Sequence, residues 1–153
     1  MPMIDRLNED MKVAMKAREG GKLRLSVIRL IKSAVKYQEI ENGENLDDDG
    51  IVAVIARELK QRREVLPDYQ KNGRDDMVRT LEEEITILMD YLPKQLDEGE
   101  IRAMIAEIIA ETGAVGPKDM GKVMSKISAA TKGKADGRAV SDLVKEMLAA
   151  LTQ

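Results

Sequence analysis

The sequence predicts an all-α protein, in which a four-helix N-terminal unit precedes a small three-helix C-terminal tail domain. The first observation is composition: aromatic residues make up only 2% of the 153 residues, while methionines number ten. This composition favours helices and is poor for β-sheets. Second, apolar residues recur at helical spacings along most of the chain. Third, Gly and Pro stand between these periodic segments, where helices end or begin.

Two helices are predicted at the N-terminus, over residues 3–18 and 22–41, with Gly20-Gly21 separating them. The first has Ile4, Leu7 and Met11 on one face. The second ends at Asn42-Gly43, a typical helix stop. Its expected inner stripe consists of Leu23, Val27, Leu30/Ile31, Ala34 and Tyr37.

The third and fourth helices are predicted over residues 48–71 and 75–91. Asp47 is the expected N-cap of the third helix. Pro67 falls within its apolar pattern and should kink the helix or divide it near Leu66. Pro93 ends the fourth helix, because the residue before a proline disfavours helical geometry.

Residues 93–96 are the predicted hinge between an N-terminal domain (1–92) and a C-terminal domain (97–153). Asp97-x-x-Glu100 resembles a capping box that starts a new helix. Three shorter helices are expected over residues 98–112, 118–131 and 137–151. Asp136-Gly137 should cap the last of them, with the Asp side chain accepting from a free backbone N–H.

Composition also limits the chemistry. The chain has no His and no Cys, which removes the usual general base, the commonest metal ligand and all thiol chemistry. The stretch Asn45–Gly50 imitates a calcium loop but lacks the required Glu, so helix capping explains its aspartates better. We therefore expect no metal, no cofactor and no catalytic constellation. With no membrane-length apolar run and no signal peptide, a cytoplasmic protein without a membrane partner is expected.

The net charge of −3 argues against a general nucleic-acid binder, and no DNA partner is expected. Locally the balance reverses: residues 118–138 hold six basic and two acidic residues, an excess of +4. These side chains are the predicted RNA-binding candidates: Lys118, Lys122, Lys126, Lys132, Lys134 and Arg138. A lysine row leading into a basic loop suits a phosphate backbone. In the alternative interpretation, these lysines are only the solvated face of an amphipathic helix.

Gly121, inside this helix, is expected to let a neighbouring helix approach closely.

Five other basic residues form a second candidate surface, for a protein partner: Arg29, Lys32, Lys36, Arg62 and Arg63. Arg62 and Arg63 interrupt the apolar stripe of the third helix. In the alternative interpretation, their stems lie along apolar surface and their heads reach water or an acidic partner such as Asp90 or Glu84.

Several motifs together resemble the YqeY family. They are LNEDMKVAMKARE at 7–19, RELKQRREVLPDYQKNGRDDM at 57–77, DYLPKQL at 90–96, ETGAVGPKDMGKVM at 111–124 and KGKADGRAV at 132–140. The C-terminal part is also similar to the tail of the B subunit of the glutamine-dependent tRNA amidotransferase. Besides the lysines, the positions matching the tail motif are Asp119, Met120, Gly121, Asp136 and Gly137.

The resemblance implies an all-helical, two-domain protein whose small tail domain contacts tRNA. Three functions follow as hypotheses. The chain is a tRNA-binding accessory module, with amidotransferase or other translation proteins as further partners. Alternatively, it is an amidotransferase-like enzyme subunit, a carbon–nitrogen ligase with glutamine as amide donor. The third possibility is a helical protein–protein adaptor without an RNA role.

Overall fold

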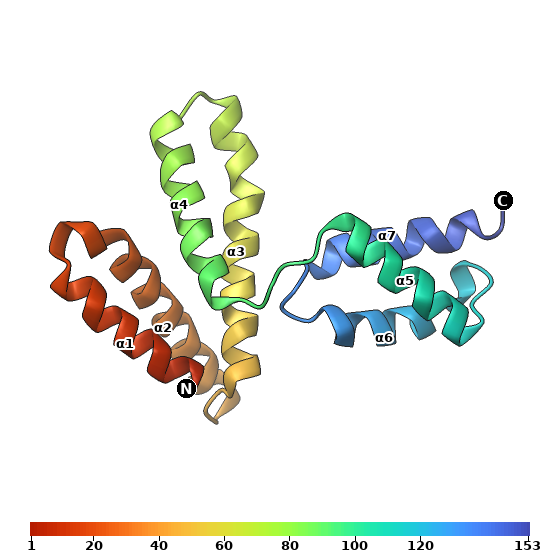
Figure 1. The fold of residues 1–153 in the computed structure, drawn as a ribbon, viewed down its shortest axis with the longest axis horizontal. Helices are drawn as coiled ribbons and strands as arrows, with labels where there is room; N and C mark the ends of the chain where they lie inside the picture. Colours follow the sequence, from red (N-terminus) through yellow and green to blue (C-terminus); the bar gives the residue numbers. More distant parts are fainter. The chain divides into compact units, whose positions relative to one another are not determined.

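The computed structural model describes residues 1–153 and confirms the all-α prediction, with seven α-helices and no strand (Figure 1). Contacts divide the chain into two compact units, Met1–Leu92 and Pro93–Gln153. Each unit has its own apolar core. No helix combines the length and the apolar character that a membrane span requires.

The first unit contains two helical hairpins (Figure 1). Its elements are α1 (Met3–Lys16), the 3₁₀ turn η1 (Arg18–Gly21), α2 (Lys22–Asn42), α3 (Asp48–Lys71) and α4 (Asp75–Tyr91). All four helices contribute fully buried side chains to one core, including Leu7, Ile28, Ile55 and Leu88. The apolar stripes of the amphipathic helices therefore converge within this unit.

The turn between α1 and α2 depends on close packing at Gly21. A Cβ atom placed on Gly21 would lie 2.2 Å from the carbonyl oxygen of Ala14, closer than packed atoms come. Helix α1 ends at Lys16 rather than at the predicted residue 18, because the chain turns at Arg18, whose φ is 54°. Gly21 therefore sets how closely η1 approaches α1.

The predicted inner stripe of α2 is partly wrong. Leu30 and Tyr37 are 48% and 67% exposed, whereas the buried residues are Val27, Ile28, Ile31 and Val35. Adjacent apolar residues, such as Leu30 and Ile31, leave the phase of the helix ambiguous in the sequence. Packing against the rest of the unit fixes the phase: Leu23 and Ala34 of the predicted stripe pack against the core, whereas Leu30 and Tyr37 stay at the surface.

Helix α3 begins as predicted: Asp47 is its N-cap, and the Gly50 N–H donates to Asp47 Oδ1 over 2.8 Å. Pro67 lies inside the helix and does not divide it. A proline cannot donate to the carbonyl four residues earlier, here that of Arg63. Both Arg63 and Pro67 are exposed, so water can satisfy that carbonyl and the helix continues.

The second unit contains α5 (Glu98–Thr112), the 3₁₀ turn η2 (Pro117–Asp119), α6 (Met120–Thr131) and α7 (Gly137–Ala150). The capping box is confirmed: the Glu100 N–H donates to Asp97 Oδ1, and the Asp97 N–H donates to Glu100 Oε2. The three helices share a core that includes Ile105, Val123 and Val144. The first predicted residues of α6 form η2 instead, because Pro117 starts a tight turn there.

Candidate functional site

The C-terminal basic patch is the set of six basic residues predicted to bind RNA, and all six side chains are exposed. Lys118 lies in η2, Lys122 and Lys126 in α6, Lys132 and Lys134 in the loop after α6, and Arg138 in the first turn of α7. At 1.5 Å per residue, a helical path from Lys118 to Lys132 corresponds to roughly 20 Å. The patch therefore follows the whole length of α6.

Asp119 positions the first lysines of the patch. Its Oδ2 atom accepts a hydrogen bond from the Val115 N–H over 2.9 Å, which closes the turn before α6. This backbone hydrogen bond is the main cause that lowers the pKa of Asp119, and the charges of Lys122 and Lys118 lower it further. Asp119 Oδ1 also lies 3.7 Å from Lys122 Nζ. Asp119 thus fixes the turn that leads into α6, while its negative charge partly offsets the positive charge of the patch.

Two glycines near this turn differ in what surrounds them. A Cβ atom on Gly116 would lie 2.8 Å from the side chain of Thr152, so a larger residue at 116 would have to displace that side chain. A Cβ atom on Gly121 would meet nothing within 4 Å. The prediction that Gly121 admits a neighbouring helix is therefore wrong: Gly121 is exposed on α6, next to Lys122. Met120 packs against the core of the unit and is not part of the exposed patch.

The basic loop after α6 is held by its backbone. The Lys134 N–H donates to the Thr131 carbonyl over 2.8 Å, and Gly133 has a φ of 75°. Two groups outside the loop bind its carbonyls: Gln95 Nε2 donates to Gly133 O over 2.8 Å and the Leu96 N–H donates to Lys134 O over 2.9 Å. The loop backbone is fixed in this way while its lysine side chains stay exposed.

Sequence reasoning missed this role of Gln95 and Leu96. No local sequence pattern indicates these hydrogen bonds, because both residues lie in the segment predicted as a hinge, far from the loop in sequence. Both belong to the second unit. Whether residues 93–96 work as a hinge stays a prediction.

The start of α7 confirms the predicted cap. Asp136 is the N-cap residue, and its Oδ1 atom accepts from the Arg138 N–H at 3.4 Å. Gly137 is the first residue of the helix. The two motif residues therefore direct the chain out of the basic loop and into α7.

Only two side chains of the patch form ion pairs. Lys122 pairs with Asp119, and Lys126 Nζ lies 3.5 Å from Glu111 Oε2. Surface pairs of this kind stabilise a fold by about 0–1 kcal/mol. A phosphate can therefore replace the carboxylate partner at little cost.

The five candidates for a protein-binding surface separate into two groups. Arg62 is engaged inside the first unit: its side chain is 11% exposed and pairs with Glu58 at 3.1 Å and Glu84 at 3.5 Å. Of the two interpretations of Arg62, the structure supports the acidic partner, here Glu84 of α4. Arg63 is exposed and donates to the Met89 sulfur at 3.5 Å.

The other three candidates, Arg29, Lys32 and Lys36, lie on α2 and form no ion pair. They border the exposed side chains of Leu30 and Tyr37, which the sequence placed in the core. On α2 these basic side chains without ion pairs lie beside exposed apolar side chains. The sequence did not predict this, because its pattern placed Tyr37 in the core.

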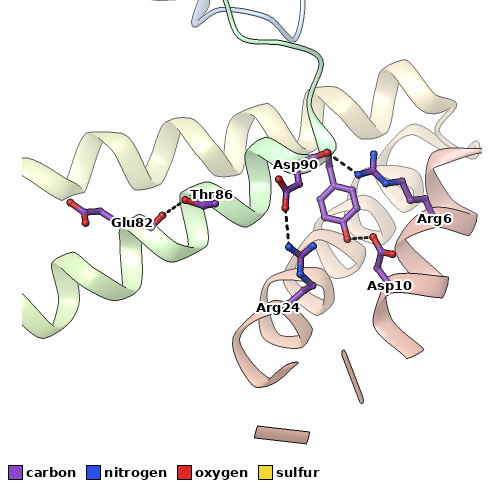
Figure 2. Close-up of polar contacts among 7 residues, drawn as sticks. Arg6, Asp10, Arg24, Glu82, Thr86 and Asp90 are labelled. Atoms are coloured by element: carbon purple, nitrogen blue, oxygen red, sulfur yellow. Dashed lines mark hydrogen bonds and ion pairs between the residues drawn. The ribbon is translucent and has the colours of Figure 1, made fainter. Parts of the chain in front are cut away.

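Polar groups gather where α4 ends, and Figure 2 shows Arg6, Asp10 and Arg24 directed toward this end of the helix. Arg24 pairs with Asp90 at 2.9 Å, and Arg6 donates to the Asp90 carbonyl at 2.8 Å. The Arg6 guanidinium also lies 4.5 Å from the centre of the Tyr91 ring.

Tyr91 is the buried member of this cluster, and its hydroxyl donates to Asp10. Burial, followed by the hydrogen bond and the charge of Asp10, raises the pKa of Tyr91 to about 12. A phenol that holds its proton this firmly suits an anchor for α4 better than a general base. The structure contains no group of three or more acidic side chains arranged to hold a metal ion.

Curated relatives of the chain are yeast proteins named "Altered inheritance of mitochondria protein 41, mitochondrial". The protein from Lachancea thermotolerans is 31% identical over 117 residues, which cover 74% of this chain and 62% of the relative. The one from Kluyveromyces lactis is 33% identical over 112 residues, covering 71% and 59%. The chain thus spans about three fifths of the length of these relatives.

The name of these relatives assigns them to mitochondria. The prediction of a cytoplasmic protein is therefore wrong by this comparison. The prediction rested on the lack of a membrane-length apolar run and of a signal-peptide pattern, and these two features do not distinguish the cytoplasm from the inside of an organelle.

The family itself is shown by a match over nearly the whole chain. The pattern described as "Yqey-like protein" matches residues 4–148, which include all four helices of the first unit and the basic patch of the second. The resemblance seen in the motifs is confirmed, and the chain belongs to the YqeY family.

Proposed function

We propose that the protein is a tRNA-binding accessory module. In this proposal the two units act as separate domains, a four-helix N-terminal domain and a three-helix tail domain that binds RNA. The observation that carries the proposal is the C-terminal basic patch, whose six basic side chains are all exposed along η2, α6 and the start of α7. Six phosphate contacts would give strong, salt-dependent binding.

The exposed residues of α6 that lie between its lysines have small side chains. Ser125 and Ala129 follow Lys122 by three and seven residues, so they lie on the same side of the helix and are exposed. Small side chains there allow a phosphate backbone to come close to α6 while the lysine side chains reach to either side. This arrangement supports contact with the backbone of a folded RNA.

The expected contacts are to phosphates and shape rather than to bases. Recognition of single-stranded RNA depends on aromatic side chains that stack on bases. All three tyrosines, Tyr37, Tyr69 and Tyr91, belong to the first unit, so none lies in the patch. Double-helical RNA, which is recognised through its backbone and shape, therefore fits the patch better.

The setting we propose is aminoacyl-tRNA amidation, with the chain as an accessory to a glutamine-dependent amidotransferase. The similarity of residues 111–124 and 132–140 to the tail of the amidotransferase B subunit supports this setting. The second candidate, an enzyme subunit acting as a carbon–nitrogen ligase, rests on the same similarity. An amide-formation assay with amidotransferase subunits, with and without the chain, separates a change of rate from mere binding.

The test of RNA binding uses the full chain and unfractionated tRNA at low and moderate salt. The Lys122→Glu/Lys134→Glu variant is compared with Lys32→Glu/Lys36→Glu, which changes the net charge equally but lies on α2. We expect only the first variant to weaken binding, and its log–log salt slope to fall in magnitude by about 2.

Equal tRNA binding by the wild type and the Lys122→Glu/Lys134→Glu variant would overturn the proposal. Circular dichroism and thermal melting of both variants ensure that a loss of binding reflects charge rather than unfolding.

A further inference from the structure

We infer that the outer face of α2 docks an acidic amphipathic helix of a partner protein. The α2 outer face is defined here by an exposed stripe with a basic border: Leu30, Ser33, Tyr37 and Ile40 form the stripe, and Arg29, Lys32 and Lys36 form the border. It belongs to the first unit and is independent of the RNA-binding proposal.

Three large apolar side chains of this stripe point to solvent. Leu30, Tyr37 and Ile40 are 48%, 67% and 72% exposed. Their spacings of seven and three residues place them along one side of α2, opposite the buried residues that face the core. The surface is hollowed here, and Ser33, Tyr37 and Ile40 line the hollow together with two lysines. Apolar side chains that are exposed along one helix face and line a hollow make this face a candidate for binding another helix.

The basic border has no acidic partner in the chain. Residues 22–38 include five basic and no acidic residues. Arg24 pairs with Asp90, whereas the side chains of Arg29, Lys32 and Lys36 form no ion pair. Like charges four residues apart, as in Lys32 and Lys36, destabilise a helix by a few tenths of a kcal/mol. Carboxylates supplied by a partner would remove that repulsion.

The apolar stripe and the basic border together indicate which kind of partner fits this face. A helix laid along the stripe would bury Leu30, Tyr37 and Ile40 with its apolar face, and its Asp or Glu residues would meet the basic border. RNA would neutralise the lysines but leave Leu30 and Ile40 uncovered. A membrane-surface helix carries basic residues around its apolar face, whereas here they border the stripe on one side only.

The probe is a helical peptide of about 20 residues, with Leu along one face and Glu beside it, as in helix-in-groove ligands. The control peptide has Lys in place of each Glu. The full chain, with labelled methyl groups, is titrated with each peptide and observed by NMR. We expect saturable binding of the acidic peptide alone, with shifts at Leu30 and Ile40.

Charge reversal then tests the border. Lys32→Glu/Lys36→Glu should weaken acidic-peptide binding at least about tenfold and create binding of the Lys peptide. Ile40→Ser should weaken binding without changing which peptide is preferred. The variant Lys122→Glu/Lys134→Glu should bind the acidic peptide as the wild type does, so this test and the RNA test fail separately.

Three results would overturn the inference. The first is no saturable binding of the acidic peptide, and the second is equal binding by the wild type and Lys32→Glu/Lys36→Glu. The third is loss of tRNA binding, or of binding to phosphatidylserine vesicles, in that variant, which would assign the face to RNA or to lipid instead.

Discussion

The hydroxyl group of Tyr91, the last residue of α4, donates a hydrogen bond to Asp10 of α1. These residues are 81 positions apart in sequence, and their contact joins the two ends of the first unit. Tyr91→Phe keeps the ring and removes only the hydroxyl. Because hydrogen bonds to charged groups contribute about 1.5–3 kcal/mol, we expect the free energy of unfolding to fall by about 1.5 kcal/mol.

Urea denaturation of the full chain measures this change. Tyr37→Phe is the matched control, because the Tyr37 side chain is 67% exposed. If both substitutions changed the unfolding free energy equally, the Tyr91 hydroxyl would have no special role.

The same residue predicts a pH dependence at high pH. Folding raises the pKa of Tyr91 to about 12, while tyrosine in an unfolded chain titrates near pH 10. The folded state therefore holds this proton more tightly. Its contribution to stability is complete below about pH 10 and is lost as the pH rises through 12. We expect the melting temperature to fall over this range, and to fall less steeply in Tyr91→Phe.

Gly21→Ala should destabilise the first unit, because the new Cβ atom would lie 2.2 Å from the Ala14 carbonyl oxygen. The neighbouring atoms belong to the backbone of α1, so relief requires a shift of η1 or of the helix. We expect a loss of about 3 kcal/mol, at the upper end for overpacking. At Gly20 an added Cβ atom meets nothing within 4 Å, which makes Gly20→Ala the control. A thermal melt in which both variants unfold alike would contradict this packing.

Arg62 and its neighbour Arg63 should respond differently to the same substitution. Arg62→Ala leaves Glu58 and Glu84, which are 19% and 15% exposed, without their cation. The cost of unpairing such partly buried carboxylates is about 2 kcal/mol. Arg63→Ala removes an exposed side chain and should cost less than about 0.5 kcal/mol.

A second substitution shows whether the charge is responsible. Adding Glu84→Gln to Arg62→Ala should recover part of the lost stability, because one unpaired carboxylate is then neutral. A double variant as unstable as the sum of the single changes would mean that the two side chains do not interact.

The sequence was sufficient for those features that depend on local chemistry. Asp47, Asp97 and Asp136 were recognised as caps because an N-cap needs only a short acceptor beside free N–H groups. The three helices of the second unit were predicted for a similar reason, since apolar residues such as Val123 and Ile127, which lie in its core, keep one helical phase. These features need no knowledge of neighbouring helices.

What the sequence could not resolve depends on packing between distant elements. In α2, apolar residues occupy two adjacent phases, and only the packed core decides that Ile31 is buried and Leu30 exposed. The partner of Arg62 lies on α4, so two interpretations stayed open until Glu84 was located. The anchoring of the basic loop by Gln95 joins residues 38 positions apart, and no local pattern indicates it.

Asp119 offers a test of charge within the C-terminal basic patch. Its carboxylate closes the turn through the Val115 N–H and lies 3.7 Å from Lys122 Nζ. Asp119→Asn retains an oxygen acceptor for the Val115 N–H but removes the negative charge. If the patch binds phosphates, tRNA affinity at low salt should therefore rise about two- to fivefold, as expected for one less repulsive charge.

Asp119→Ala removes the acceptor as well, so a lower melting temperature should accompany any change in its binding. Comparison of the two variants separates the charge of Asp119 from its place in the turn. Weaker or unchanged tRNA binding by a stably folded Asp119→Asn variant would mean that Lys122 does not meet a phosphate.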